Sequence, residues 1–258
     1  MPGGIDAYRL VGEPAELERA GLFVAEGRLI VERLLLDGRF RVHSVVVTPP
    51  AAAALADVFR QRPEVHVDVV DPDVLQEITG FDFHRGCLAL AHRPAAPMAA
   101  ADLVQATRLL AIEGVGNPDN VGGLFRTAAA FGIDGVLLNR ASGDPLYRKA
   151  IRTAMGASLR VPYARADAWL PALAQFRERG FKIVALTPSA GARSLSEVAA
   201  TVAKDERLIV LVGAEGPGLD AETIALADVA VRIPMDNAVD SLNVVVAAGI
   251  ALHALVAK

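Results

Sequence analysis

Two hydrophobic periodicities alternate along the chain, one typical of helices and one typical of strands. Apolar residues recur at helical spacing from Leu29 to Leu36, and Gly38 follows as a helix stop signal. Short runs of β-branched residues then alternate with helical segments. The pattern predicts strands at residues 43–47, 66–70 and 87–91 and helices at residues 51–60 and 74–79. The first part of the chain is therefore predicted to be a small α/β layer.

Strand and helix signals alternate again in the second part. The apolar runs that predict strands lie at residues 108–112, 135–138, 181–186, 208–212 and 229–233. Such alternation predicts an α/β fold with a mostly parallel sheet covered by helices on both faces. The final segment, residues 242–256, is apolar nearly all round, so we expect a helix buried either in the domain or against another subunit.

A segment rich in proline and alanine, residues 93–100, separates the two parts. Its two prolines break regular structure, and its small residues contribute little to a core. We therefore predict a small domain at residues 1–95, a linker at residues 96–106 and a larger domain at residues 107–258.

Composition narrows the class of protein. The chain has 258 residues, 53% of them hydrophobic, and its apolar runs are too short to span a membrane. The N-terminus lacks the basic and then apolar pattern of a signal segment. We expect a soluble cytoplasmic protein with no membrane partner. Its single cysteine, Cys87, cannot form an internal disulfide and is interpreted as buried packing rather than a catalytic thiol.

Net charge argues against an RNA partner, because surfaces that bind phosphates usually carry a basic excess and this chain carries −4. The acidic excess lies in the first part of the chain, whereas the second part contains a cluster of cations in which Asp144 is the only acid. The cation cluster consists of Arg140, Arg148, Lys149, Arg152, Arg160 and Arg165. It is interpreted as a phosphate-facing surface or as an ordinary solvated face.

Three polar stretches that follow predicted strands point to chemistry. They are residues 117–126, 211–219 and 233–244. Each follows an apolar run and precedes a helical pattern, so each lies at the carboxyl end of a strand. Ligands bind at that edge in open α/β sheets.

The first stretch combines Asn120, two glycines and Arg126. Asn120 precedes the helical pattern at residues 121–130, so it is either a plain helix N-cap or a site residue, while Gly122 and Gly123 let a substrate approach the backbone. Arg126 is expected in the first turns of this helix, near its positive end, where an anionic backbone would dock. The alternative for Arg126 is an ordinary surface arginine.

The second stretch is a glycine-rich turn. Glycines at positions 213, 216 and 218 let the main chain pack closely against a flat ligand, and Glu215 lies between them. The turn does not match the dinucleotide fingerprint, and the chain has no Walker motif, which disfavours NAD and ATP.

The third stretch supplies two polar side chains. Ser241 is a candidate N-cap of the final helix, and the Asn243 amide either faces the same cavity or is a satisfied buried amide. The five histidines of the chain show no metal-ligand spacing, so no metal is expected.

In this order and spacing, the three stretches resemble the SpoU/TrmH family of RNA ribose 2′-O-methyltransferases. The matching patterns are Asn-x-x-Asn-x-Gly-x-x-x-Arg, Gly-x-Glu-x-x-Gly-Leu, and Ile-Pro-Met followed by Ser-Leu-Asn-Val, and the likeness covers residues 108–258. The first part looks like the L30e-like RNA-recognition domain of some members, through residues 23–27 and 84–87. Asn237 stands where the family usually has glycine, and asparagine tolerates the left-handed backbone of such a turn.

The resemblance implies a SPOUT fold, in which the C-terminal segment forms a trefoil knot that binds S-adenosylmethionine. The positions that match the family's cofactor site are Leu211, Gly213, Glu215, Gly216, Ile233, Met235 and Leu242. The positions that match its catalytic residues are Arg126, Asn120, Glu215, Ser241 and Asn243. Members are dimeric, with both subunits contributing to each site and the final helix in the interface, so the resemblance also implies a homodimer.

A ribose hydroxyl is a poor nucleophile, so a protein of this kind must orient the hydroxyl and help to remove its proton. A guanidinium stays charged in proteins, so Arg126 is not expected to be the base. Our hypothesis is that Arg126 clamps a phosphate beside the target ribose, and that this phosphate or an ordered water takes the proton.

The favoured function is S-adenosylmethionine-dependent 2′-O-methylation of structured RNA, and the additional N-terminal domain favours rRNA over tRNA. The alternative is an RNA-binding protein on the same scaffold that lacks turnover. RNA contacts are expected from local arginine patches and from the cation cluster. The residues expected to bind RNA are Arg85, Arg148, Lys149 and Arg152.

Overall fold

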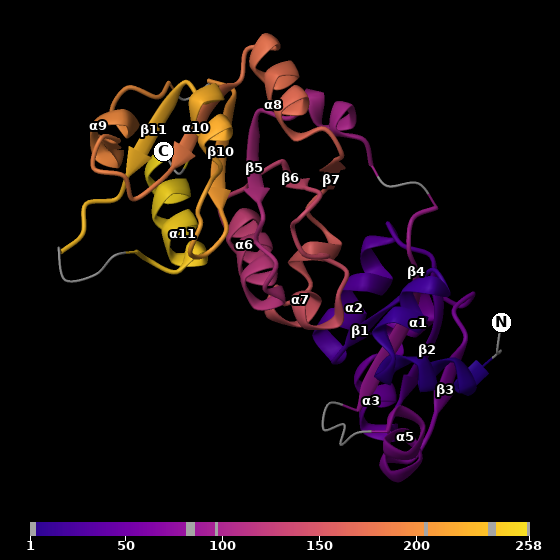
Figure 1. The fold of residues 1–258 in the computed structure, drawn as a ribbon. Helices are drawn as coiled ribbons and strands as arrows, with labels where there is room; N and C mark the ends of the chain where they lie inside the picture. Colours follow the sequence, from indigo (N-terminus) through magenta and orange to yellow (C-terminus); the bar gives the residue numbers. More distant parts are fainter. Residues whose placement is uncertain (1–3, 81–85, 96–97, 204–205, 237–240, 257–258) are drawn as a thin grey trace. The chain divides into compact units, whose positions relative to one another are not determined.

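The computed structural model describes the chain except for residues 1–3, 81–85, 96–97, 204–205, 237–240 and 257–258 (Figure 1). The chain forms two compact units. The first unit consists of Met1–Ala96 and Leu146–Arg160, and the second of Pro97–Pro145 and Val161–Lys258. The sequence-based domain prediction had placed residues 146–160 in the second domain.

The first unit is built on a four-stranded mixed sheet. Its strands are β1 (Leu22–Glu26), β2 (Val42–Val47), β3 (Val67–Val69) and β4 (Cys87–His92), in the spatial order β1-β4-β2-β3. β4 is antiparallel to both β1 and β2, whereas β2 and β3 are parallel. The three predicted strands of this part are confirmed, and β1 is a fourth strand that the periodicity did not predict.

Short helices surround this sheet. They are η1 (Gly4–Gly12), α1 (Pro14–Arg19), α2 (Arg28–Asp37), α3 (Pro49–Ala54), α4 (Ala56–Gln61), α5 (Pro72–Thr79), α7 (Arg148–Thr153) and η3 (Ala157–Leu159). The single helix predicted at residues 51–60 is wrong, because Leu55 leaves helical geometry at φ −103°, ψ 7° and separates α3 from α4.

Helix α2 confirms the predicted helix but presents a different apolar face. Gly38 ends it in the left-handed conformation, at φ 71°, as the stop signal predicted. The residues that α2 buries are Ile30, Val31, Leu34 and Leu35. Leu29 and Leu36 are 42% and 51% exposed, so the apolar stripe is rotated relative to the predicted one.

Cys87 lies in β4 and is fully buried, as predicted. Burial raises the pKa of its thiol to about 12. Since the thiolate is the reactive form, Cys87 packs the core as a small apolar side chain.

The second unit is built on a seven-stranded sheet in which every strand pair is parallel. Its strands are β5 (Arg108–Glu113), β6 (Gly135–Asn139), β7 (Tyr163–Ala166), β8 (Lys182–Leu186), β9 (Arg193–Ser194), β10 (Leu208–Gly213) and β11 (Val229–Arg232). The spatial order is β7-β6-β5-β10-β8-β11-β9. The predicted α/β fold with a mostly parallel sheet is confirmed, whereas the edge strands β7 and β9 were not predicted.

Helices pack on both faces of this sheet. They are α6 (Pro118–Ala130), α8 (Trp169–Glu178), α9 (Leu195–Ala199), α10 (Ala221–Leu226) and α11 (Val244–Leu255), with η2 (Ala100–Gln105) before β5. Alternate strand residues such as Leu109 and Leu211 join Leu173 and Phe176 of α8 in one core cluster. Helices α6 and α11 pack against each other, and α11 also packs on β10. The central strands are buried on both faces for this reason.

The strand order places a switch point between β5 and β10. From β5 the chain continues outward through β6 to β7, while β10 lies on the other side of β5. The connections that leave β5 and β10 therefore diverge at their carboxyl ends. Crevices that bind ligands in open α/β sheets occur at such points.

Helix α11 is buried along only one side within the single chain. Its buried residues are Val244, Ala248, Ala251, Leu252 and Leu255. Val246 and Ile250 are 50% and 40% exposed. Within the described residues, no helix is both long and apolar enough to cross a membrane.

Candidate active site

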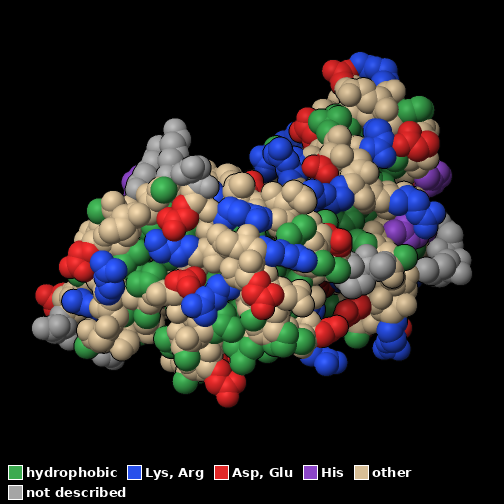
Figure 2. Space-filling model, turned by 90° about the horizontal axis from the view of Figure 1, so that it is seen from above, with side chains coloured by type: hydrophobic (Ala, Val, Ile, Leu, Met, Phe, Trp, Pro, Cys, Tyr) green, Lys and Arg blue, Asp and Glu red, His purple; other side chains and the backbone are tan. Residues whose placement is uncertain are grey.

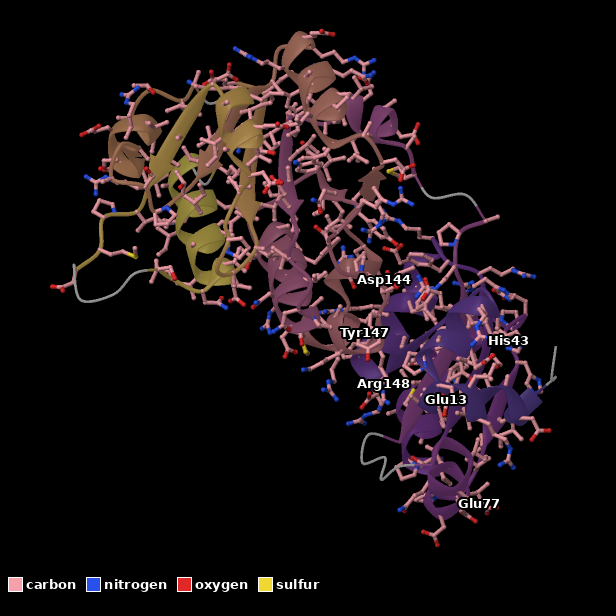
Figure 3. The ribbon with its side chains drawn as sticks, in the orientation of Figure 1. Glu13, His43, Glu77, Asp144, Tyr147 and Arg148 are labelled. Carbon is pink, nitrogen blue, oxygen red and sulfur yellow. The ribbon has the colours of Figure 1, made fainter. Side chains whose placement is uncertain are left out.

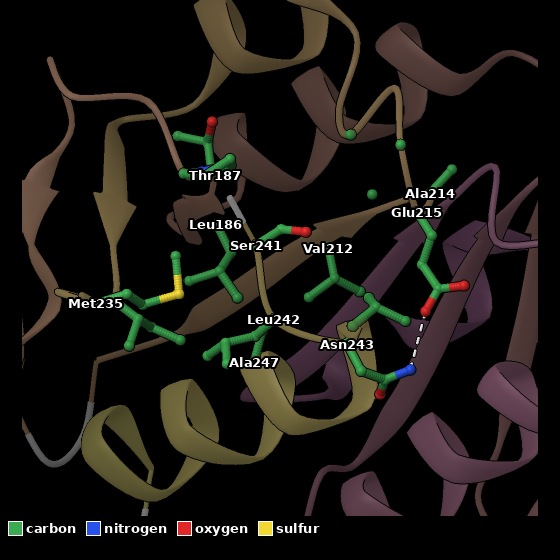
Figure 4. A pocket seen from close by; sticks show the side chains of 16 residues that line it. Leu186, Thr187, Val212, Ala214, Glu215, Met235, Ser241, Leu242, Asn243 and Ala247 are labelled. Carbon is green, nitrogen blue, oxygen red and sulfur yellow. Dashed lines mark hydrogen bonds between the residues drawn. The ribbon is translucent and has the colours of Figure 1, made fainter. Parts of the chain in front are cut away.

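A pocket of about 390 Å³ opens at the carboxyl ends of β8, β10 and β11 (Figure 4). Four segments line it, and most of the side chains that Figure 4 labels are small or apolar. The lining residues are Leu186, Thr187, Pro188, Val212, Gly213, Ala214, Glu215, Gly216, Gly218, Ile233, Met235, Ser241, Leu242, Asn243, Val244 and Ala247. A mostly apolar cavity with a few convergent polar groups is the usual form of a small-ligand site.

The turn after β10 forms one wall and requires glycine. A side chain at Gly213 would overlap with the backbone of Gly218 and Leu219, because Ala214 and Gly218 pair across the turn. Gly216 and Gly218 have φ values of +90° and +76°, which glycine adopts without strain. The turn therefore folds back tightly and presents its backbone to the pocket.

The Asn243 side chain joins the three polar stretches. Its Nδ2 donates to Asn120 Oδ1 at 3.0 Å and to Glu215 Oε1 at 2.9 Å. Its Oδ1 accepts the backbone N–H groups of Val245 and Val246 at 2.9 and 3.4 Å. Both donors of the amide are thus used, and the amide fixes the carboxylate of Glu215 at the edge of the pocket (Figure 4).

The helix cap predicted at Ser241 is wrong. Asn243 is the N-cap of α11, whereas Ser241 lies before the helix and lines the pocket. The Asn243 amide faces the cavity, as one alternative predicted, and its hydrogen bonds are satisfied. The other alternative, a buried amide, is wrong, because the side chain is exposed.

The cap predicted at Asn120 is likewise wrong. Helix α6 begins at Pro118, and Asn117 is its N-cap, with Oδ1 accepting the N–H of Asp119 at 2.9 Å. Proline at the first helical position starts the helix earlier than the apolar pattern indicated. Asn120 is therefore inside the first turn, 7% exposed, where its side chain meets Asn243.

Arg126 does not lie in the first turns of α6, contrary to expectation. It is the ninth residue of a helix that begins at Pro118, so it is in the third turn, and its side chain is exposed. It does not line the pocket of its own chain.

The predicted cofactor residues separate into two groups. Those that line the pocket are Gly213, Glu215, Gly216, Ile233, Met235 and Leu242. The Leu211 side chain instead belongs to the core cluster on the face of α8. Side chains alternate along a strand, so the next residue of β10, Val212, faces the pocket.

Glu113, which the sequence analysis did not single out, lies directly behind this site. It ends β5, pairs in register with Gly213 and is only 4% exposed. Burial raises the pKa of its carboxyl above the ordinary value, the Asp220 carboxyl adds to the increase, and the Thr223 hydroxyl opposes it. The sequence did contain a signal for Glu113. It follows the apolar run at residues 108–112 directly and has no cation beside it in the sequence, which is unusual for a buried carboxylate.

The residues expected to bind RNA have mixed surroundings. Arg148, which Figure 3 labels, has its Nε 2.8 Å from Glu26 Oε2 in a largely buried ion pair. Lys149 and Arg152 follow it on α7. Arg85 lies outside the described residues, as does Asn237. In Figure 2, Lys and Arg side chains are interspersed with Asp and Glu on the face drawn.

Within the described part of the chain, no group of three His, Cys, Asp or Glu side chains is placed to hold a metal ion.

The fold and the pocket together define a class of protein. Residues 107–253, which include this parallel α/β unit and the segments that line its pocket, match the family model of the SpoU rRNA Methylase family. The chain belongs to this family, and the predicted relationship is confirmed.

Relatives and solved structures agree with this assignment. Over 232 residues, the chain is 40% identical to a protein of Mycobacterium tuberculosis named an uncharacterized tRNA/rRNA methyltransferase, covering 90% of this chain and 80% of the relative. It is similar to a putative RNA methyltransferase of the TrmH family from Porphyromonas gingivalis, with 26% identity, a TM-score of 0.80, and coverage of 99% and 98% of the two chains. An AdoMet-bound rRNA methyltransferase from Sinorhizobium meliloti is 25% identical, with a TM-score of 0.79 and coverage of 97% and 93%.

The turn after β10 yields a stability prediction. Gly213→Ala forces the new methyl group into the backbone of Gly218 and Leu219, which we expect to cost about 2 kcal/mol and to lower Tm by roughly 4–8 °C. Gly191→Ala is the matched control, because the nearest atom to its new methyl group would be Ser189 Oγ at 4.0 Å, an ordinary contact. Thermal unfolding of both variants checks this, and equal Tm values would contradict the close backbone approach.

The hydrogen bonds of the Asn243 side chain yield a second prediction. Asn243→Ala removes an N-cap and two donated hydrogen bonds, so we expect a loss of about 2 kcal/mol of unfolding free energy. Ser241→Ala, which removes no cap of α11, should change stability by less than about 0.5 kcal/mol. Urea unfolding of Asn243→Ala, Asn120→Ala and the double variant should show a coupling of about 1 kcal/mol. Strictly additive losses would mean that the contact between the two amides contributes nothing.

Proposed function

We propose that this protein transfers a methyl group from S-adenosylmethionine to a ribose 2′-hydroxyl of structured RNA. The observation that carries the proposal is the Asn243 junction, which joins Asn120 and Glu215 at the edge of the glycine-walled pocket. These residues come from the three motifs by which the sequence resembles the family. The AdoMet-bound structural neighbour from Sinorhizobium meliloti supports the cofactor.

The pocket suits an adenosine-containing cofactor. Ile233, Met235 and Leu242 provide apolar contacts, and the backbone of the Gly213 turn provides polar groups. Its volume falls within the usual range for small-molecule sites, roughly 300–1,000 Å³. When bound, the cofactor supplies a methyl group already activated by its sulfonium centre.

The protein then has to orient the ribose 2′-hydroxyl and provide a group that accepts its proton. Glu215 is held by Asn243 through one carboxylate oxygen, which leaves the other oxygen for a substrate hydroxyl or water. Ser241 lines the same pocket and offers a second polar contact. We propose that the proton leaves to an RNA phosphate clamped by Arg126 or to an ordered water, since Arg126 itself stays charged.

Arg126 fits this role in a homodimer. It does not line the pocket of its own chain, and it is exposed on α6 beside α11. The uncovered residues Val246 and Ile250 of α11 give a second copy an apolar surface to pack against. In the proposed dimer, Arg126 of one subunit serves the pocket of the other.

The first unit is proposed to select the RNA, as an L30e-like domain, and this additional domain favours rRNA over tRNA. The trefoil knot stays a prediction, because residues 237–240, which connect Met235 to Ser241, lie outside the described residues. The cytoplasmic location also stays a prediction. The alternative of an RNA-binding protein without turnover is disfavoured, because Arg126, Glu215, Ser241 and Asn243 are all retained.

The reaction is tested by incubating the protein with methyl-labelled S-adenosylmethionine and RNA from a source strain that lacks this gene. After nuclease digestion we expect the label in a 2′-O-methyl nucleoside, and fractionation of the RNA should place it in rRNA. Label in a base would contradict ribose specificity. Cofactor binding by calorimetry without any transfer, while a control methyltransferase is active on the same RNA, would favour the binding-protein alternative.

The proposed clamp is tested by Arg126→Lys. A lysine ammonium cannot form the two parallel hydrogen bonds of a guanidinium, so we expect kcat to fall about 10²-fold. Arg179→Lys, at an exposed arginine after α8, is the matched control and should keep normal turnover. Single-turnover assays at saturating RNA separate chemistry from binding, and near-normal turnover of Arg126→Lys would rule out the bidentate clamp.

A further inference from the structure

Arg165 belongs to the cation cluster that the sequence suggested for phosphate contacts, yet its guanidinium binds the protein's own backbone. It lies on the edge strand β7, half-buried. Nη1 donates to the carbonyl oxygens of Asn139 and Ser142 at 2.9 and 2.8 Å, with a longer contact of 3.4 Å to that of Arg140. Nη2 donates to the carbonyl oxygen of Gly143 at 3.3 Å.

The loop held in this way, residues 139–143, in turn holds the backbone that leaves β5. Asn139 Oδ1 accepts the N–H of Gly114 at 2.9 Å. Ser142 Oγ donates to the carbonyl oxygen of Ile112 at 2.9 Å. The N–H of Gly143 donates to the carbonyl oxygen of Val115 at 2.9 Å.

The two loops are also packed without spare room. A side chain at Gly143 would lie 2.9 Å from the carbonyl oxygen of Gly116 and 3.2 Å from the Val121 side chain. Gly116 is followed by Asn117, which caps α6, and Asn120 in the first turn binds Asn243. Hydrogen bonds, packing contacts and the backbone of residues 116–120 therefore link the Arg165 guanidinium to the Asn243 amide.

We propose that Arg165 is a positioning residue of the active site and not an RNA contact. It fixes residues 139–143, these fix the loop between β5 and α6, and that loop sets where Asn120 meets Asn243 and so where Glu215 is held. The inference rests on the proposed methyltransferase function for its kinetic consequence. Its structural content, the coupling of Arg165 to the two asparagine amides, does not depend on that function.

The residue type suits the task. Arginine presents five N–H donors in a rigid planar fork and stays charged, so one side chain can hold several carbonyl oxygens that diverge from one loop. Lysine has three donors on one rotating atom and cannot span the same set. Both Nη atoms of Arg165 already donate to backbone carbonyl oxygens. The guanidinium is therefore poorly placed to form a bidentate contact with a phosphate.

The test compares Arg165→Met and Arg165→Lys with Arg179→Met, an exposed arginine of the same unit outside the site. At a temperature well below the Tm of every variant, we expect kcat at saturating RNA and cofactor to fall about 10- to 100-fold for both Arg165 variants. The dependence of RNA affinity on salt should keep its wild-type slope. Normal kcat with a slope reduced by about one would identify Arg165 as a phosphate contact and overturn the proposal.

A second readout is independent of catalysis. The side-chain amide NMR signals of Asn120 and Asn243, assigned from Asn→Asp variants, should shift in Arg165→Met and stay unchanged in Arg179→Met. Unchanged signals in Arg165→Met would overturn the proposal even if its Tm falls, because Arg165 would then stabilise the fold without setting the site. Failure of the wild type to methylate RNA would count against the proposed function alone, and the amide signals would still decide the role of Arg165.

Discussion

One side-chain amide holds the site together. Asn243 caps α11 with its oxygen and binds Asn120 and Glu215 with its nitrogen, so three segments far apart in the sequence meet at a single group. A planar amide has fixed donor and acceptor directions, and each partner must therefore sit at a defined angle. The precision of the pocket edge follows from this constraint.

The parallel sheet brings these segments within reach of one another. Strands β5 and β10 are adjacent and end at the same edge, so α6 and the glycine turn start side by side. Glu113 at the end of β5 pairs in register with Gly213 at the end of β10. Asn139, at the end of β6, accepts the N–H of Gly114 in the loop after β5. Buried and partly buried polar contacts outside the pocket lining therefore support the site, and such contacts are stronger where water is excluded.

Several cations of this acidic chain have internal partners. Arg148 pairs with Glu26, Arg160 lies 3.9 Å from Asp37, and Arg165 binds backbone carbonyls. A dense run of cations in the sequence therefore overstates the charge that is available to RNA phosphates. The Arg126 side chain, by contrast, is exposed on α6.

The sequence by itself determined the alternation of strands and helices, the parallel sheet of the second unit and the motif spacing that identified the family. These follow from local periodicity, which burial on both faces of a sheet enforces. Tertiary structure decided the role of individual side chains. Asn117 and Asn243 cap helices, Leu211 packs in the core, and the Arg165 guanidinium binds backbone carbonyl oxygens. Several neighbouring residues satisfy the local rules for a cap or a surface cation equally well. The fold selects among them, through the actual start of each helix and through partners distant in sequence such as Asn120 for Asn243 and residues 139–143 for Arg165.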